Sequence, residues 1–99
     1  MLLAPEEIRL AQAEGNTVWL TTDQERLRAF SRGLRALEEK VKGHGFLRVN
    51  RNSVVNLAQV REIAPSFKGG FALVLDGLTE QAVPVSRRHA AEVRRLLGL

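Results

Sequence analysis

The sequence predicts a mainly β domain of antiparallel strands with two short helices. Apolar residues alternate with polar ones over much of the chain, as they do in half-buried strands. Pairs of turn residues, Gly15-Asn16 and Asp76-Gly77 among them, separate the alternating segments. Helical spacing is found in residues 33–42 and 87–97. The 99 residues allow a single domain, residues 1–99, with one small core.

The first part of the chain contains three predicted strands. Residues 8–13 and 17–22 lie on either side of Gly15-Asn16, whose residues tolerate positive φ angles, so the two segments are expected to form a hairpin. Residues 26–30 alternate polar and apolar side chains and predict a third strand. Trp19 is expected to lie in the core rather than to serve as a stacking platform for bases.

A short surface helix is predicted next, over residues 33–42. Leu34, Leu37 and Val41 recur at helical spacing along one face, and charged residues occupy the other. Ser31 is expected to cap the start of this helix.

The second half continues with strands and ends in a helix. The predicted strands are residues 46–49, 53–57, 60–63, 71–75 and 79–85, and the last two form a hairpin around Asp76-Gly77. Ser86 is expected to cap a closing helix over residues 87–97. Asn56, inside an apolar segment, is expected to be a hydrogen-bonded structural residue.

Composition excludes several classes of protein. The chain has no cysteine, which excludes a disulfide framework and makes a reducing cytoplasm the expected compartment. No apolar run reaches the roughly 18–20 residues of a membrane helix, so no contact with a membrane is expected. Glycine-rich phosphate loops, histidine clusters and nucleophile–base pairs are lacking. We therefore expect no metal, no cofactor, no catalytic residue and no enzymatic activity.

Positive charge is concentrated in the second half of the chain. Residues 1–45 hold seven basic and seven acidic residues, whereas residues 46–99 hold eight basic and four acidic ones. Twelve of the fifteen basic residues are arginines, which suit contacts with phosphate and guanine. This distribution makes nucleic-acid binding one candidate function, and thermophilic adaptation is another source of a high arginine content.

Three ordered segments resemble one family. Residues 46–57 look like the signature segment of the LytTR DNA-binding domain, the output module of many bacterial response regulators. Residues 71–77 and 83–88 are similar to later segments of that family, and residues 8–20 and 33–38 to its opening hairpin and short helix. The resemblance covers essentially the whole chain in the right order.

The resemblance implies an elongated stack of small antiparallel sheets that reads double-stranded DNA without a recognition helix. Loops on one side would enter successive major grooves of bent DNA and regulate bacterial transcription. By position, the residues implied in base contacts are Asn16, Asn50, Arg51, Asn52, Arg87 and Arg88. The residues that could neutralise phosphates are Arg48, Lys68, Arg94 and Arg95.

Several alternatives stay open at this point. Asn50 and Asn52 could be turn formers, and Arg87 and Arg88 a solvated first turn of a helix. The second loop departs from the family, because Asn50-Arg51-Asn52-Ser53 stands where relatives usually carry His, Arg, Ser and an aromatic residue. The recognition sequence of a relative is therefore not transferred.

The family also implies partners beyond DNA. A second copy on paired half-sites and a receiver or other input domain are expected from the resemblance, and the chain could be a stand-alone regulator or an excised domain. The expected location is the cytoplasm, with the nucleoid. The alternative function is a small β module that binds proteins, or nucleic acid without base readout.

Overall fold

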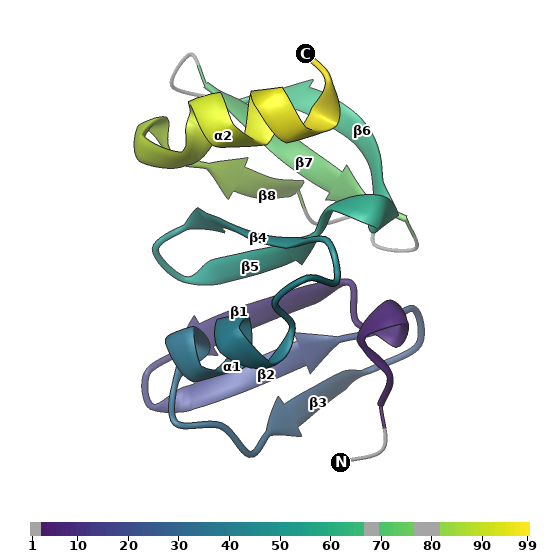
Figure 1. The fold of residues 1–99 in the computed structure, drawn as a ribbon, viewed down its shortest axis with the longest axis vertical. Helices are drawn as coiled ribbons and strands as arrows, with labels where there is room; N and C mark the ends of the chain where they lie inside the picture. Colours follow the sequence, from purple (N-terminus) through teal and green to yellow (C-terminus); the bar gives the residue numbers. More distant parts are fainter. Residues whose placement is uncertain (1–2, 67–69, 77–81) are drawn as a thin grey trace.

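The computed structural model describes residues 3–66, 70–76 and 82–99, which form two antiparallel sheets with two helices (Figure 1). The strands are β1 (Leu10–Glu14), β2 (Thr17–Thr21), β3 (Arg26–Ala29), β4 (Phe46–Asn50), β5 (Ser53–Asn56), β6 (Val60–Pro65), β7 (Phe71–Leu75) and β8 (Ala82–Val85). The helices are α1 (Leu34–Lys40) and α2 (Arg87–Leu97), with single 3-10 turns at Pro5–Glu7 and Leu57–Gln59. The molecule measures 36 × 25 × 24 Å, and the predicted mainly β stack is confirmed.

The larger sheet has the strand order β3-β2-β1-β5-β4, and the smaller one β6-β7-β8. The predicted first hairpin pairs Leu10 with Thr21 and Glu14 with Thr17, and Gly15 supplies a φ of 59° at its turn. β5 pairs with the other edge of β1, where Val54 lies opposite Ala11. The predicted β7–β8 pairing is present, although residues 77–81 of its turn lie outside the described residues.

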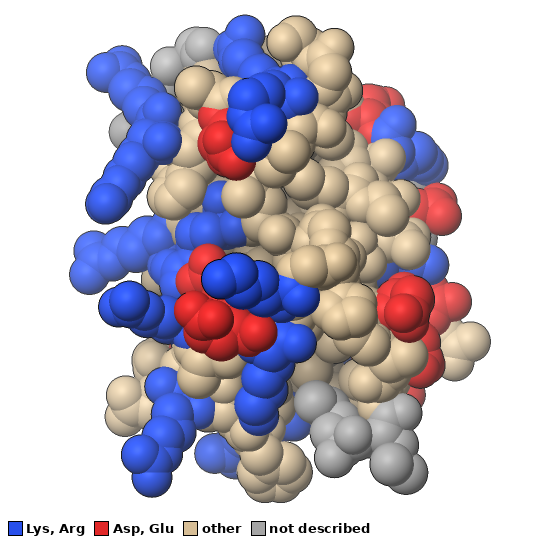
Figure 2. Space-filling view, viewed as in Figure 1, with Lys and Arg blue, Asp and Glu red and all other residues tan. Residues whose placement is uncertain are grey.

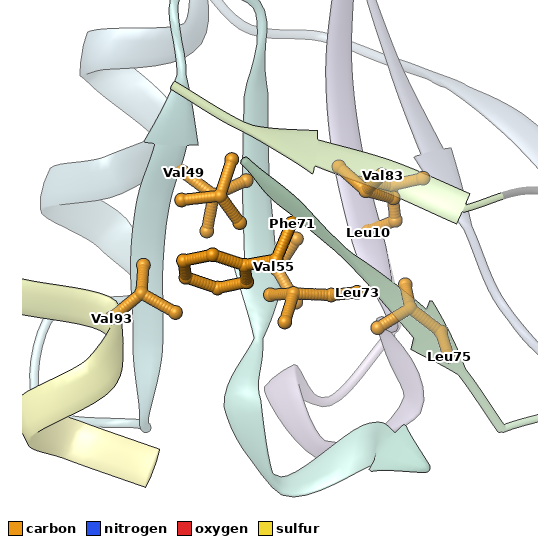
Figure 3. Packing of buried hydrophobic residues seen from close by; sticks show 9 residues of the cluster. Leu10, Val49, Val55, Phe71, Leu73, Leu75, Val83 and Val93 are labelled. Carbon is orange, nitrogen blue, oxygen red and sulfur yellow. The ribbon is translucent and has the colours of Figure 1, made fainter. Parts of the chain in front are cut away.

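One apolar cluster joins the two sheets and α2 (Figure 3). Leu10 of β1 and Val55 of β5 face Leu73 of β7, and all three are fully buried. Val93 of α2 closes the cluster from one side, as the helical spacing in residues 87–97 predicts. The small sheet and α2 therefore stand on one face of the large sheet.

A second cluster lies on the opposite face of the large sheet, beneath α1. Leu34 and Leu37 of α1 pack there against Leu20 of β2. β5 supplies both clusters, because Val54 faces α1 and Val55 faces the small sheet. This is why all four residues of β5 are buried.

Trp19 is not a core residue, so that prediction is wrong. Its neighbours Val18 and Leu20 both point toward α1, which directs Trp19 to the other face of the sheet. Trp19 is half-buried there, with the guanidinium carbon of Arg26 4.6 Å from the centre of its ring. Arg26 also pairs with Glu14 at 2.8 Å. Trp19 is thus covered by an arginine from the neighbouring strand.

The two serines that were predicted to cap the helices do not do so. α1 begins after Gly33, whose φ is 111°, and Ser31 donates its hydroxyl to the Gly33 carbonyl oxygen at 3.0 Å instead of capping the helix. Ser86 does occupy the N-cap position of α2, but its side chain makes no capping hydrogen bond to that helix. It pairs instead with Nδ1 of His89, 2.7 Å away.

Asn56 is confirmed as a structural residue, and its replacement by alanine should destabilise the fold. The side chain is 3% exposed, its Nδ2 donates to the Ile8 carbonyl oxygen at 2.9 Å, and its Oδ1 accepts the Ala58 N–H at 3.1 Å. Asn56→Ala leaves both partners without this amide, so we expect a loss of about 1–3 kcal/mol in the free energy of unfolding, measured by urea denaturation. Replacement of the exposed Gln24 by alanine is the control. Equal stability of the two variants would contradict the role of Asn56.

Candidate nucleic-acid interface

Three segments that the family resemblance links to DNA lie along one side of the molecule. In Figure 1 the β1–β2 turn, the β4–β5 turn and the start of α2 all lie on the left side of the view. We call this side the turn edge and define it as residues 15–17, 50–53 and 86–88. These segments are far apart in the sequence, so the fold brings them together.

Backbone hydrogen bonds hold these segments side by side. The N–H of Ala13, just before the β1–β2 turn, donates to the carbonyl oxygen of Asn52 at 2.9 Å. The N–H of Ser86 donates to the carbonyl oxygen of Val49 at 2.9 Å. The β4–β5 turn is therefore fixed to β1 at Asn52, and the end of β4 that leads into it is fixed to the start of α2 at Val49.

Asn50 uses both ends of its amide within the protein. Its Nδ2 donates to the carbonyl oxygen of Pro84 at 2.8 Å, and its Oδ1 accepts the N–H of Asn52 at 2.8 Å. The first bond ties the turn to β8, and the second closes the turn itself. Of the two interpretations of Asn50, these bonds support the turn-forming one. The side chain of Asn52, by contrast, is exposed.

Arg51 and Arg88 come together at a hollow of about 610 Å³ on the turn edge. Both side chains are exposed, as is that of Arg87. The hollow is lined by Glu38, Arg48, Arg51, Ser86, Arg88 and His89. The fold thus places arginines from the β4–β5 turn and from α2 around one hollow.

A second hollow, of about 540 Å³, contains Asn16 together with residues that the sequence interpretation did not select. Its lining is Asn16, Thr17, Arg28, Ala29, Phe30, Ser31 and Arg32. Phe30 is 90% exposed. A signal for this exposure exists in the sequence, because Phe30 falls in the same phase of the β3 alternation as the exposed Arg26 and Arg28.

Arg48 is already paired inside the protein. Its Nη2 lies 2.5 Å from Oε1 of Glu38, and its Nη1 donates to the carbonyl oxygen of Arg51 at 2.9 Å. A phosphate that approaches Arg48 would have to compete with the carboxylate of Glu38. The structure therefore gives this arginine a partner that the sequence interpretation did not include.

Of the other residues predicted to contact phosphate, Arg95 is paired with an acidic residue and Arg94 is exposed. Arg95 pairs with Glu92 at 2.7 Å, and this hydrogen bond and charge raise the pKa of Arg95. Arg94 is exposed, with its guanidinium carbon 4.9 Å from the centre of the Phe71 ring. Lys68 lies outside the described residues.

Positive charge gathers on the same side of the molecule as the turn edge. Figure 2, drawn in the orientation of Figure 1, shows Lys and Arg side chains projecting along the left side, while most of the Asp and Glu side chains lie elsewhere in the view. Arg51, Arg87 and Arg88 of the turn edge are exposed, and so is Arg32, which lines the hollow that contains Asn16. Such a surface attracts a polyanion.

The described residues contain neither a candidate metal-binding cluster nor a helix that could span a membrane. Within them, no group of three or more His, Cys, Asp or Glu side chains is placed to hold a metal ion. None of the helices in that part of the chain has the length and apolar character needed to cross a membrane.

Comparison with known proteins identifies the family. The sequence model of a protein family, the LytTr DNA-binding domain, matches residues 1–98 of this chain. Sensory transduction protein LytT from Oceanobacillus iheyensis is 37% identical over 90 residues, which cover 91% of this chain and 37% of that protein. LytT from Enterococcus faecalis is 30% identical over 98 residues, or 99% of this chain and 39% of that protein. The chain thus spans about two fifths of the length of these curated relatives.

Two further similarities extend the comparison. The positive alginate biosynthesis regulatory protein of Pseudomonas aeruginosa is 42% identical over 64 residues, which cover 65% of this chain and 25% of that protein. The fold matches a solved LytTr DNA-binding domain from Bacillus cereus with a TM-score of 0.83 and 23% identity, over 98% of this chain and 86% of that one. With the match to the family model over nearly every residue, these results show that the chain belongs to the LytTR family of DNA-binding domains.

Proposed function

We propose that this domain binds double-stranded DNA in a sequence-specific manner through the turn edge and acts in bacterial transcription regulation. The observation that carries the proposal is that Arg51 and Arg88 line the same hollow, on the arginine-rich side of a LytTR domain. The two turns and the start of α2 would enter successive major grooves, and bending of the DNA would add indirect readout. The names of the relatives, which describe sensory transduction and regulatory proteins, support the regulatory role.

The residues of the turn edge differ in the base that their side chains can recognise. Arg51, Arg87 and Arg88 are exposed and suited to guanine O6 and N7, whereas Asn16 and Asn52 are exposed and suited to adenine N6 and N7. Asn50 belongs to the positioning of the turn, since both ends of its amide are engaged.

Phosphate contacts supply affinity without sequence information, and Arg94 is proposed for this role. Arg94→Gln is expected to lower affinity about equally for all duplexes and to reduce the slope of log affinity against log salt by about one. Fluorescence anisotropy titrations over a series of salt concentrations measure both quantities. Arg61→Gln is the matched control, because it removes the same charge from β6, on the other side of the view (Figure 1). An unchanged slope for Arg94→Gln would remove Arg94 from the interface.

The proposed function is tested by selection of bound duplexes from a random pool at about 150 mM salt, where non-specific contacts are weakened. We expect enrichment of a short motif, and a repeat at about one helical turn would indicate two copies on paired half-sites. An unenriched pool that nevertheless binds would instead support a module without base readout. Absence of binding would favour a protein-interaction domain.

The relatives are longer than this chain, so the domain is proposed to act together with another part of a regulator. A receiver or other input domain is the expected partner, because the relatives are sensory transduction proteins by name. The expected site of action is the cytoplasm, where the DNA lies.

A further inference from the structure

We propose that Glu38 and Arg48 are positioning residues for DNA recognition, which hold the β4–β5 turn so that Arg51 faces the DNA. The inference rests on the function proposed above. It gives Arg48 a role other than phosphate contact and brings α1 into the recognition of DNA.

Arg48 links α1 to the backbone of the β4–β5 turn. Its Nε and Nη2 donate to Oε1 of Glu38 at 3.0 and 2.5 Å, and its Nη1 donates to the carbonyl oxygen of Arg51 at 2.9 Å. The guanidinium is flat and rigid, so one side chain can bridge a carboxylate and a carbonyl in a defined geometry. A lysine carries the same charge but cannot reproduce this fork.

The link lies where it can control the direction of Arg51. The Arg48 and Glu38 side chains are 25% and 35% exposed, so their contact is partly shielded from water. The other sides of the turn are held by the bonds of Asn50 and Asn52 described above. With the carbonyl of Arg51 also held, the backbone from which its side chain projects has little freedom, and orientation is what base readout requires.

The effect of the Glu38 charge on DNA binding distinguishes a positioning role of Arg48 from phosphate contact. Glu38 is the one acidic residue among the described residues that line the hollow, and its carboxylate repels phosphate. If Arg48 only neutralised a phosphate, removal of the Glu38 charge would strengthen binding to every duplex. If the pair positions Arg51, the same change weakens binding to the preferred duplex and leaves binding to an unrelated duplex equal or stronger. The two roles therefore predict opposite results.

The experiment compares Glu38→Gln and Arg48→Lys with Glu39→Gln. Glu39 is the next residue of α1, is exposed and does not line the hollow, so its variant makes the same charge change outside the pair. The probes are the duplex that the wild-type chain enriches from the random pool and a scrambled duplex of equal composition. The ratio of the two dissociation constants should fall about five- to tenfold for Glu38→Gln and Arg48→Lys, part of the loss expected from deletion of Arg51 itself, and should hold for Glu39→Gln.

A double-mutant cycle shows whether the effect passes through Arg51. In an Arg51→Ala background, Glu38→Gln should change the ratio no further, because the side chain that it positions is gone. A substitution that merely loosened the fold would lower binding to both duplexes and would do so in either background. Thermal unfolding by circular dichroism accompanies each variant to separate these cases.

The possible outcomes are distinct. Tighter binding of Glu38→Gln to both duplexes, an unchanged ratio, or an effect that persists without the Arg51 side chain would each overturn the positioning role while leaving sequence-specific binding intact. If the wild-type chain enriches no duplex, the proposed function fails and the positioning role fails with it.

Discussion

Replacement of Arg51 by alanine is expected to weaken binding to the selected duplex by about 1–3 kcal/mol and to relax base preference at one position of the site. The side chain is exposed, so the loss should fall on binding and not on stability, which should change by no more than about 0.5 kcal/mol. The carbonyl oxygen that accepts from Arg48 remains in the variant. Arg88→Ala should have an effect of similar size at a neighbouring position, because both arginines line the same hollow.

The measurement is the affinity of each variant for the selected duplex and for single-base variants of it. Arg61→Ala on β6 is the control for loss of one positive charge, and it should keep the base preference unchanged. Normal selectivity in both Arg51→Ala and Arg88→Ala would contradict the assignment of the turn edge as the reading surface. A uniform loss across all duplexes would instead place the two arginines on phosphates.

Replacement of Leu10 by alanine is expected to destabilise the fold by about 2–5 kcal/mol, a large part of the roughly 5–15 kcal/mol that holds a typical domain together. Leu10 is 0% exposed and lies in β1, at the centre of the large sheet, where it faces the small sheet. Its truncation leaves a cavity at the junction of the two sheets. Urea denaturation followed by circular dichroism measures the change.

Leu96→Ala provides a matched control, since Leu96 of α2 is 45% exposed and its truncation leaves no buried cavity. Its effect should stay within about 1 kcal/mol. A loss of similar size in the two variants would show that the cluster between the sheets is not the main core.

Local pattern was sufficient to predict most elements of this fold. The alternation around Gly15-Asn16 predicted the first hairpin, and the helical spacing of Ala90, Val93 and Leu97 predicted α2 and its buried face. Pairing over long distances was not predictable in the same way. Nothing local indicates that β5 pairs with the free edge of β1, yet this pairing places the β4–β5 turn beside the β1–β2 turn.

Side-chain partners also depend on this long-range arrangement. The Arg48–Glu38 pair joins a strand to a helix, so the sequence alone left Arg48 as a free cation available to phosphate. Trp19 shows a second limit, since an apolar residue in an alternating strand need not enter the core when its face of the sheet is only partly covered. The location of the candidate interface came from the family resemblance, and the geometry of its residues came from the structure.

The most direct test of the interface is a map of backbone amide shifts when the ¹⁵N-labelled chain is titrated with the selected duplex. We expect the largest changes at residues 15–17, 50–53 and 86–88, with smaller changes at Arg28 and Arg32 beside Asn16. The exposed residues of β6 should stay unchanged. Changes centred on β6 and absent from the turn edge would contradict the assignment of this surface to DNA.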